Sequence, residues 1–300
     1  MSTNVPRANP LRRFTPLLWV GPAAALIIGV VIWPVVVMAT TSTLNISPDG
    51  FNLGSAGLGN YRELFQEIAL PGVLMRTAVW VVGVVVVTMV VSLLLAQLFN
   101  QAFPGRRVAR WALIAPWGAS VMMTSLIFRW ALNAQNGVVN VILHDLGLVN
   151  LGTDQADWLG RPVAAFVWMM AVAVFVSLPF STYAILAGLQ TMDSAVYEAA
   201  RVDGASPWRI YRSITLPLLR PALIVATLIN VINVFNSFPI IWEMTRGGPG
   251  YSTSTTTTFM FILKQSYIGE SAALSVINFA IVVIVALVFL KVAKWKDQVD

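Results

Sequence analysis

Apolar residues along the 300-residue chain gather into six long runs, separated by shorter polar segments. Each run reaches the length of about 20 residues that an α-helix needs to cross the hydrocarbon core of a bilayer. The pattern predicts spans at Leu17–Thr40, Val73–Phe99, Val108–Ala131, Pro162–Leu189, Pro221–Trp242 and Ala272–Val292. The expected fold class is therefore an all-α integral membrane protein, because helices satisfy their own backbone hydrogen bonds in lipid.

Basic residues indicate how these spans are oriented. Positive charge accumulates on the cytoplasmic side of membrane proteins. An internal N-terminus places most of the basic residues inside: Arg7, Arg12, Arg13, Arg106, Arg107, Arg110, Arg201, Arg209, Arg212, Arg220, Lys291, Lys294 and Lys296. Both termini are then cytoplasmic, which fits six spans. We expect residues 1–16 to form a cytoplasmic tail and residues 17–300 a transmembrane domain, with one substantial cytoplasmic loop at 190–220.

The first apolar run could instead belong to a cleaved signal peptide, because three arginines precede it. Its apolar stretch is too long for a signal peptide, and no clear small-x-small cleavage site follows it. A permanent first span is the favoured interpretation.

The composition narrows the function further. The chain is 57% hydrophobic and 11% charged, and none of the ionisable residues lies near the middle of a predicted span. Ion-coupled transporters and proton relays usually need an intramembrane charge. Any transport energy is therefore expected from elsewhere, and any substrate is expected to be uncharged. The net charge is +6, and most of the basic residues lie at the ends of predicted spans. We therefore predict that the protein associates with the lipid membrane and not with nucleic acid.

Cofactor chemistry finds little support in the sequence. The chain has no cysteine, and its single histidine, His144, has no second histidine or carboxylate cluster at metal-ligand spacing. No Walker A motif is present either, so the chain is not expected to bind or hydrolyse ATP itself.

The cytoplasmic loop carries the signals of two short helices joined by a turn. Asp193 or Ser194 can cap a helix over Ala195–Asp203, since their side-chain oxygens accept free amide protons. Gly204 suits the position after the helix end, where φ is positive. Ser206 and Pro207 then form a second start signal. The helix could lie on lipid headgroups, but its small alanines favour close approach of another protein.

The same loop resembles a known motif. Glu198-Ala199-Ala200, three residues, Gly204, nine residues and Ile214-x-Leu216-Pro217 is similar to the EAA loop of ABC importer permeases. The resemblance implies a coupling helix that docks on an ATPase subunit and is formed by Glu198, Ala199, Ala200, Asp203 and Gly204. When the two ATPase subunits close on each other, this helix would move as a rigid body and transmit that movement to the membrane helices.

That family assignment implies the remaining partners. We expect a second permease subunit, two copies of an ABC ATPase that bind ATP and Mg²⁺, and an extracytoplasmic sugar-binding protein or lipoprotein. The expected location is the inner (plasma) membrane of a bacterium. This chain would hold no cofactor and perform no chemistry itself.

Two further segments narrow the subclass. Gly57-Leu58-Gly59-Asn60-Tyr61 with Leu64-Phe65 resembles a segment that precedes the second span in carbohydrate-type permeases. Gly247-Gly248-Pro249 is similar to a turn of maltose-like permeases, although glycine and proline also mark plain turns. The chain resembles the compact six-span form. The resemblance therefore implies a sugar, with a neutral disaccharide or oligosaccharide favoured.

Uncharged polar residues in the fifth span suggest the substrate path. Asn230, Asn233 and Ser237 share one helical face and could bond sugar hydroxyls. They could equally hold helices together. Comparison with maltose-type permeases favours the first interpretation and adds Ser177 and Phe180 of the fourth span; the Phe180 ring could stack on a sugar.

Three expectations stay open. The outer run Ser252–Thr258 is either a solvated loop or a contact for the binding protein. A self-contained facilitator or secondary transporter is the alternative function, disfavoured by the lack of intramembrane charge and of obvious repeats. A membrane enzyme is disfavoured because the sequence brings no nucleophile, base and acid together.

Overall fold

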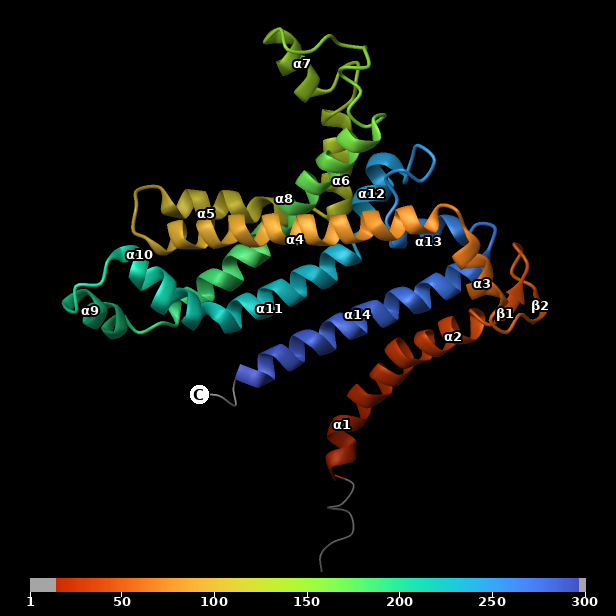
Figure 1. Ribbon diagram of the computed structural model, residues 1–300, viewed down its shortest axis with the longest axis horizontal. Coiled ribbons are helices and arrows are strands. Elements are labelled where there is room, and N and C mark those ends of the chain that lie inside the picture. The colour runs from red at the N-terminus through yellow and green to blue at the C-terminus, as the bar shows by residue number, and fades with distance from the viewer. Residues whose placement is uncertain (1–14, 297–300) are drawn as a thin grey trace, which may run out of the picture. The chain divides into compact units, whose positions relative to one another are not determined.

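The computed structural model describes residues 15–296, which form two compact units (Figure 1). Residues up to Gln66 together with Leu263–Ile277 make the first unit, and Glu67–Ile262 with the residues from Asn278 onward make the second. The last helix, α14 (Ile268–Lys296), contributes to both. Almost all of the predicted N-terminal tail, residues 1–14, lies outside the described residues.

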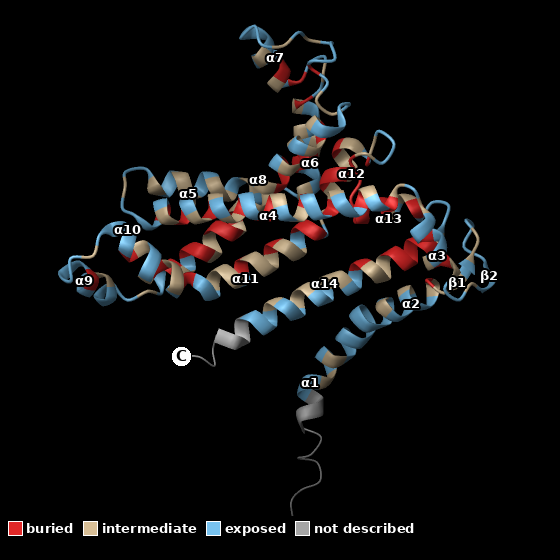
Figure 2. Ribbon diagram, in the orientation of Figure 1, coloured by how far each residue is buried: buried red, intermediate tan, exposed pale blue. Residues whose placement is uncertain are grey.

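The first unit begins with one long helical run. It comprises α1 (Thr15–Leu26), a π-helical stretch η2 (Ile27–Ile32) and α2 (Trp33–Thr41). The segment from Trp19 to Thr41 is apolar enough to span a membrane, and none of its residues is buried within the chain (Figure 2). This surface is therefore left for lipid or for another protein.

A short hairpin and a helix complete the first unit. Strands β1 (Leu44–Ile46) and β2 (Asn52–Ser55) pair antiparallel, and α3 (Gly59–Gln66) follows. The Asn60 amide donates to the carbonyls of Ser42 at 2.8 Å and Leu44 at 2.9 Å, and the Tyr61 hydroxyl bonds the Ser42 hydroxyl at 2.8 Å. The Gly57–Tyr61 segment thus has a local structural role, because it fastens α3 to the end of the first span.

Three long helices build the core of the second unit: α4 (Leu70–Asn100), α8 (Pro162–Gln190) and α11 (Leu216–Phe235). α4 packs along α8, and α11 packs against both. Two buried apolar clusters lie along them, one around Trp80, Met169 and Val234, the other around Phe99, Ile185 and Leu219. Figure 2 shows buried residues concentrated along these helices.

The third predicted span is two helices rather than one. α5 (Arg106–Ile114) and the 3₁₀ turn η3 (Ala115–Gly118) meet α6 (Val121–Ala131) at a bend of 97°. Pro116 and Gly118 weaken the helix there, and Ser120 starts a new one by accepting a hydrogen bond from Met123 N at 3.2 Å. Among the described residues, five helices are long and apolar enough to span, or six if this bent pair counts as one.

The predicted fifth span is part of a longer helical stretch. After α9 (Ser194–Val202), the chain continues through α10 (Pro207–Ile210), the π-helical η4 (Tyr211–Thr215), α11 and α12 (Phe238–Thr245).

The connection between α4 and α5 is held by arginines: Arg110 donates to Phe99 O at 2.6 Å, and Arg106 donates to Gln101 O at 3.2 Å. These cations satisfy carbonyls at the negative end of α4.

The outer Ser/Thr run is not a solvated loop, so that alternative is wrong. All residues from Thr253 to Thr258 are buried, leading into α13 (Thr256–Leu263). Arg76 Nε donates to Ser254 O at 3.2 Å, and Thr256 N donates to Thr77 Oγ1 at 2.9 Å. The segment packs on α4, so these side chains do not offer an open surface to a binding protein.

The short helix α7 (Val138–Asp145) completes the second unit.

Close packing of α8 on α11 depends on Gly188. A Cβ at this position would lie 2.6 Å from the Ala222 Cβ and 3.0 Å from Leu219 Cδ1. We therefore expect Gly188→Leu to destabilise the protein by roughly 1–3 kcal/mol through overpacking. Gly29→Leu is the control, because nothing lies within 4 Å of a Cβ at Gly29. Thermal unfolding in detergent measures the effect; equal midpoints for both variants would contradict it.

Candidate functional site

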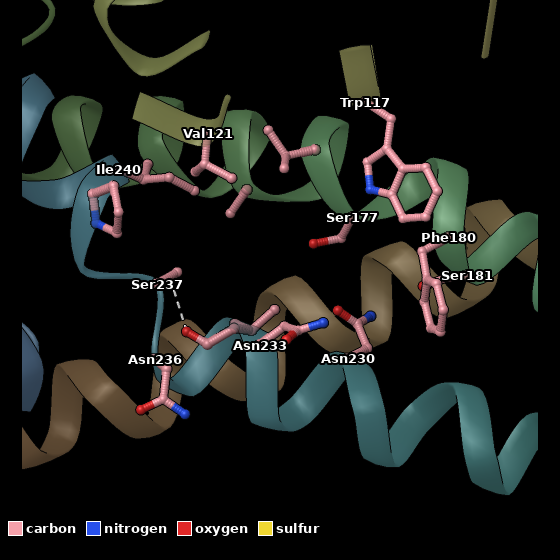
Figure 3. Close-up of a pocket in the computed structure, with 14 residues that line it drawn as sticks. Trp117, Val121, Ser177, Phe180, Ser181, Asn230, Asn233, Asn236, Ser237 and Ile240 are labelled. Atoms are coloured by element: carbon pink, nitrogen blue, oxygen red, sulfur yellow. Dashed lines mark hydrogen bonds between the residues drawn. The ribbon is translucent and has the colours of Figure 1, made fainter. Parts of the chain in front are cut away.

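A cavity of about 410 Å³ lies in the second unit between α8, α11 and the start of α12 (Figure 3). Its wall contains all five residues that the sequence placed on the substrate path: Ser177, Phe180, Asn230, Asn233 and Ser237. They come from two helices and a helix break that are distant in sequence. Such a volume is typical of a small-molecule site.

Asn230 is the most unusual residue of this wall. Its side chain is 2% exposed, and neither its amide nitrogen nor its amide oxygen has a hydrogen-bond partner within the described structure. The hydroxyl of Ser181, also on the wall, is buried and unpartnered too. Buried polar groups are normally paired, since an unpaired one costs about 1–3 kcal/mol. The cavity therefore holds both a donor and an acceptor in need of partners.

Ser237 reaches the cavity for a different reason than expected. The prediction that it continues the helical face of Asn230 and Asn233 is wrong, because α11 ends at Phe235 and α12 starts at Phe238. Pro239 has no amide proton for the carbonyl four residues earlier, so the helix breaks. Ser237 lies in this break, with its hydroxyl donating to Val234 O at 2.8 Å.

An aromatic pair closes part of the wall. The rings of Phe180 and Trp117 are 6.3 Å apart between centroids and tilted by 37°, and both line the cavity. Sequence analysis did not select Trp117 as a site residue. The signal that could have found it is its neighbour Pro116, which marks the helix break that turns Trp117 toward α8.

The cavity wall carries no charged side chain. Its polar groups are amides and hydroxyls, and the rest is apolar or aromatic. Asn236 touches the cavity but is exposed, and its amide donates to Ile232 O at 2.9 Å. Figure 3 shows this side chain directed away from the other polar groups. The arrangement can bind an uncharged polar molecule by hydrogen bonds and ring contact.

The EAA-like motif between residues 193 and 217 has the local structure that its sequence predicts. The Asp193 carboxylate accepts from Ala195 N at 2.9 Å at the start of α9, and Ser206 accepts from Arg209 N at 3.3 Å at the start of α10. Gly204 has a φ of +75°, so the turn between these helices needs glycine there. Sequence analysis therefore located both caps and the turn correctly.

The five residues that were predicted to form a coupling helix do not all face outward. Glu198, Ala199, Asp203 and Gly204 are exposed, whereas Ala200 is buried against the chain itself. Apolar side chains that the sequence analysis did not select are exposed beside them: Val196, Val202 at 88% and Trp208. Spacing of three residues puts Val196, Ala199 and Val202 on neighbouring turns of α9. We call the exposed side chains of Val196, Ala199, Val202 and Trp208 the loop apolar face.

Metal binding finds no geometric support in the part of the chain that the structure covers. No three His, Cys, Asp or Glu side chains between residues 15 and 296 come together as a possible metal site. The His144 Nδ1 atom lies 3.0 Å from Val149 O, within its own loop.

Comparison with known proteins identifies similar chains among transport permeases of the membrane. Residues 88–295 match the family model described as "binding-protein-dependent transport system inner membrane component". A probable ABC transporter permease protein of Brucella suis biovar 1 is 37% identical over 95% of this chain and 99% of its own length. The sulfoquinovosyl glycerol transport system permease of Agrobacterium fabrum is 33% identical, over 95% and 92%. The trehalose/maltose permease MalF of Thermococcus litoralis is 34% identical over 69% of each chain.

Solved structures share the fold. A chain from the crystal structure of a bacterial ABC transporter for the acidic polysaccharide alginate matches with a TM-score of 0.77 at 19% identity, over 94% of this chain and 98% of that one. A second alginate transporter structure, in complex with its periplasmic protein, gives 0.74 at 19% identity, over 93% and 96%. The chain is a multi-pass permease of the ABC importer type, and it belongs to the family of inner membrane components of binding-protein-dependent transport systems.

Proposed function

We propose that this permease carries a neutral sugar across the membrane through the cavity between α8 and α11. The observation that carries the proposal is Asn230, buried in the cavity wall with both amide atoms unpartnered. A sugar hydroxyl both donates and accepts hydrogen bonds, so adjacent hydroxyls of one ring can satisfy both atoms of one amide. A site built in this way rejects molecules that lack these groups.

The other wall residues suit the same ligand. Ser177, Asn233 and Ser237 offer further hydrogen-bonding groups, and Phe180 with Trp117 offers an apolar surface for the C–H face of a pyranose ring. An anionic sugar would need a cation, which the wall does not have. The trehalose/maltose relative is named for neutral disaccharides, which supports this substrate class. The alginate transporters and the sulfoquinovosyl glycerol permease are named for substrates that carry acidic groups, which we do not expect here.

The loop apolar face supports docking of an ATPase subunit. Exposed apolar side chains on a loop outside the spans favour a protein partner, because water solvates them poorly. Glu198 and Asp203 lie on the same short helix and offer carboxylates to that partner. Gly204 sets the turn, and buried Ala200 lets α9 lie close to its own chain. Two copies of the ATPase would bind ATP and Mg²⁺ outside this chain.

The remaining partners complete the importer. The first span, none of whose residues is buried, leaves a surface for a second permease subunit. An extracytoplasmic sugar-binding protein would deliver the substrate, in keeping with the family description. We assign both termini and the α9–α10 loop to the cytoplasm from the distribution of arginines and lysines. Family membership supports this function over a self-contained facilitator.

Uptake of a small sugar panel tests the proposed substrate class. Proteoliposomes containing the assembled transporter and its binding protein are offered maltose, trehalose, diacetylchitobiose and an alginate oligosaccharide. We expect a neutral sugar to accumulate in the presence of ATP and the alginate fragment to be excluded, because the cavity wall lacks a cation. Accumulation of the alginate fragment alone would overturn the proposal.

A further inference from the structure

The break between α11 and α12 changes the hydrogen bonding of the Val234 carbonyl. In a continuous α-helix, Phe238 N would donate to Val234 O, four residues earlier. Here Phe238 N donates to Asn236 O at 2.8 Å instead. At the break, Val234 O accepts instead from Ser237 N at 3.2 Å, so its acceptor bonds differ from those of a continuous helix.

Trp80 on α4 supplies a further donor to this carbonyl, from another helix. Its side chain is 1% exposed, and its indole N–H lies 3.0 Å from Val234 O and 3.0 Å from Ser237 Oγ. The Ser237 hydroxyl in turn donates to Val234 O at 2.8 Å. One indole nitrogen thus contacts both the Val234 carbonyl and the serine that lines the cavity.

The Trp80 ring is itself held firmly. It packs edge-on against Phe166 of α8 at 5.7 Å between ring centroids, and it belongs to the buried apolar cluster around Met169 and Val234. A fixed donor favours the one arrangement of the break that satisfies it, since a buried N–H left without an acceptor is costly. Trp80 does not line the cavity, so it acts through the residues that do.

We propose that Trp80 is a positioning residue for the sugar site, fixing the α11–α12 break so that Ser237 and Ile240 face the cavity. The expected effect of Trp80 on transport rests on the proposed function, whereas its expected effect on the α11–α12 break does not. When the indole N–H is absent, the remaining donors to Val234 O come from residues of the break itself, Ser237 among them, and Phe238 N can compete for that carbonyl. The start of α12, which forms one wall of the cavity through Pro239 and Ile240, is then released.

Single cysteines report this release, because the chain contains no natural cysteine. Ile240→Cys lies after the break at a site where the native side chain is 2% exposed, and Asn233→Cys lies before it; both native residues line the cavity. In the assembled transporter in nanodiscs, we expect Trp80→Phe to raise the labelling rate of Ile240→Cys by a small methanethiosulfonate about fivefold, the factor for one lost hydrogen bond. The rate at Asn233→Cys stays unchanged.

Trp158→Phe is the matched control. Its indole N–H donates to Asn140 Oδ1 at 2.7 Å, away from the cavity wall, so its loss leaves the labelling of Ile240→Cys unchanged. An unchanged rate in Trp80→Phe would overturn the inference. So would equal increases at both cysteines, because they would show that Trp80 supports only general packing.

Transport kinetics separate this inference from the proposed function. For the panel sugar that is transported, Trp80→Phe is expected to raise the sugar concentration for half-maximal uptake about fivefold with little change in maximal rate. The effect of combining it with Ser237→Ala is expected to be less than additive, because both act on one hydrogen-bonded unit. Half-maximal uptake that responds to Asn230→Leu but not to Trp80→Phe contradicts the inference alone. Insensitivity to Asn230→Leu contradicts the sugar site instead.

Discussion

Replacing Asn230 with leucine is expected to stabilise the protein and to abolish most of its sugar uptake. The native amide is buried with both polar atoms unpartnered, so its replacement by an apolar side chain of similar size removes a penalty of roughly 1–3 kcal/mol. The same change removes a donor and an acceptor for the sugar, which corresponds to a loss of roughly tenfold to a hundredfold in uptake efficiency. A substitution that raises the stability of the protein but lowers its sugar uptake identifies a residue whose role is in function rather than in folding.

Asn236→Leu provides the matched control for this prediction. That amide is exposed and already bonded to Ile232 O, so its replacement should leave uptake within about twofold of the native protein. Thermal unfolding in detergent and ATP-driven uptake in proteoliposomes are measured for both variants. If Asn230→Leu unfolded at a lower temperature than the native protein, the amide would have a structural partner, and its assigned role would be wrong.

Gly204→Val is expected to separate the permease from its ATPase. Gly204 has a φ of +75°, a conformation that costs a side-chain-bearing residue about 1–2 kcal/mol and costs a β-branched one most. Space is not the obstacle, because nothing lies within 4 Å of a Cβ there. The strained turn moves α10 relative to α9 and disrupts the loop apolar face. We expect most of the ATPase to be lost when the tagged chain is purified in mild detergent, while the chain still inserts into the membrane.

Gly204→Asn is the control for backbone strain, because asparagine adopts positive φ more readily than other residues with side chains. It should retain most of the ATPase. Val202→Glu tests the surface instead of the turn, since it places a charge on the most exposed apolar side chain of α9. Full ATPase recovery with both Gly204→Val and Val202→Glu would show that this loop is not the docking site.

The sequence was informative where the physics is local. Four of the six predicted spans, the caps at Asp193 and Ser206 and the positive φ at Gly204 depend on nearby residues, and the structure has them within a few residues of where they were expected. The resemblance of the loop to the EAA motif and the polar residues of two spans also led to the correct family and to one cavity.

Features that depend on distant contacts were not predictable in the same way. The polarity of the Ser/Thr run favoured either a solvated loop or a binding-protein contact, but Thr253–Thr258 are buried, with hydrogen bonds to Arg76 and Thr77, far away in sequence. Trp80 looked like any apolar residue of a span, since its partner Val234 O is a backbone group. Trp117 joined the cavity only because the third span bends by 97°.

The most direct test of the central claim is uptake into proteoliposomes that contain the complex purified through a tag on this chain. The account predicts that a neutral sugar accumulates only when ATP and the binding protein are both supplied, and that Asn230→Leu removes this accumulation while leaving the complex assembled. Sugar uptake by the chain alone, without ATP or partner subunits, would contradict the account and establish a facilitator instead.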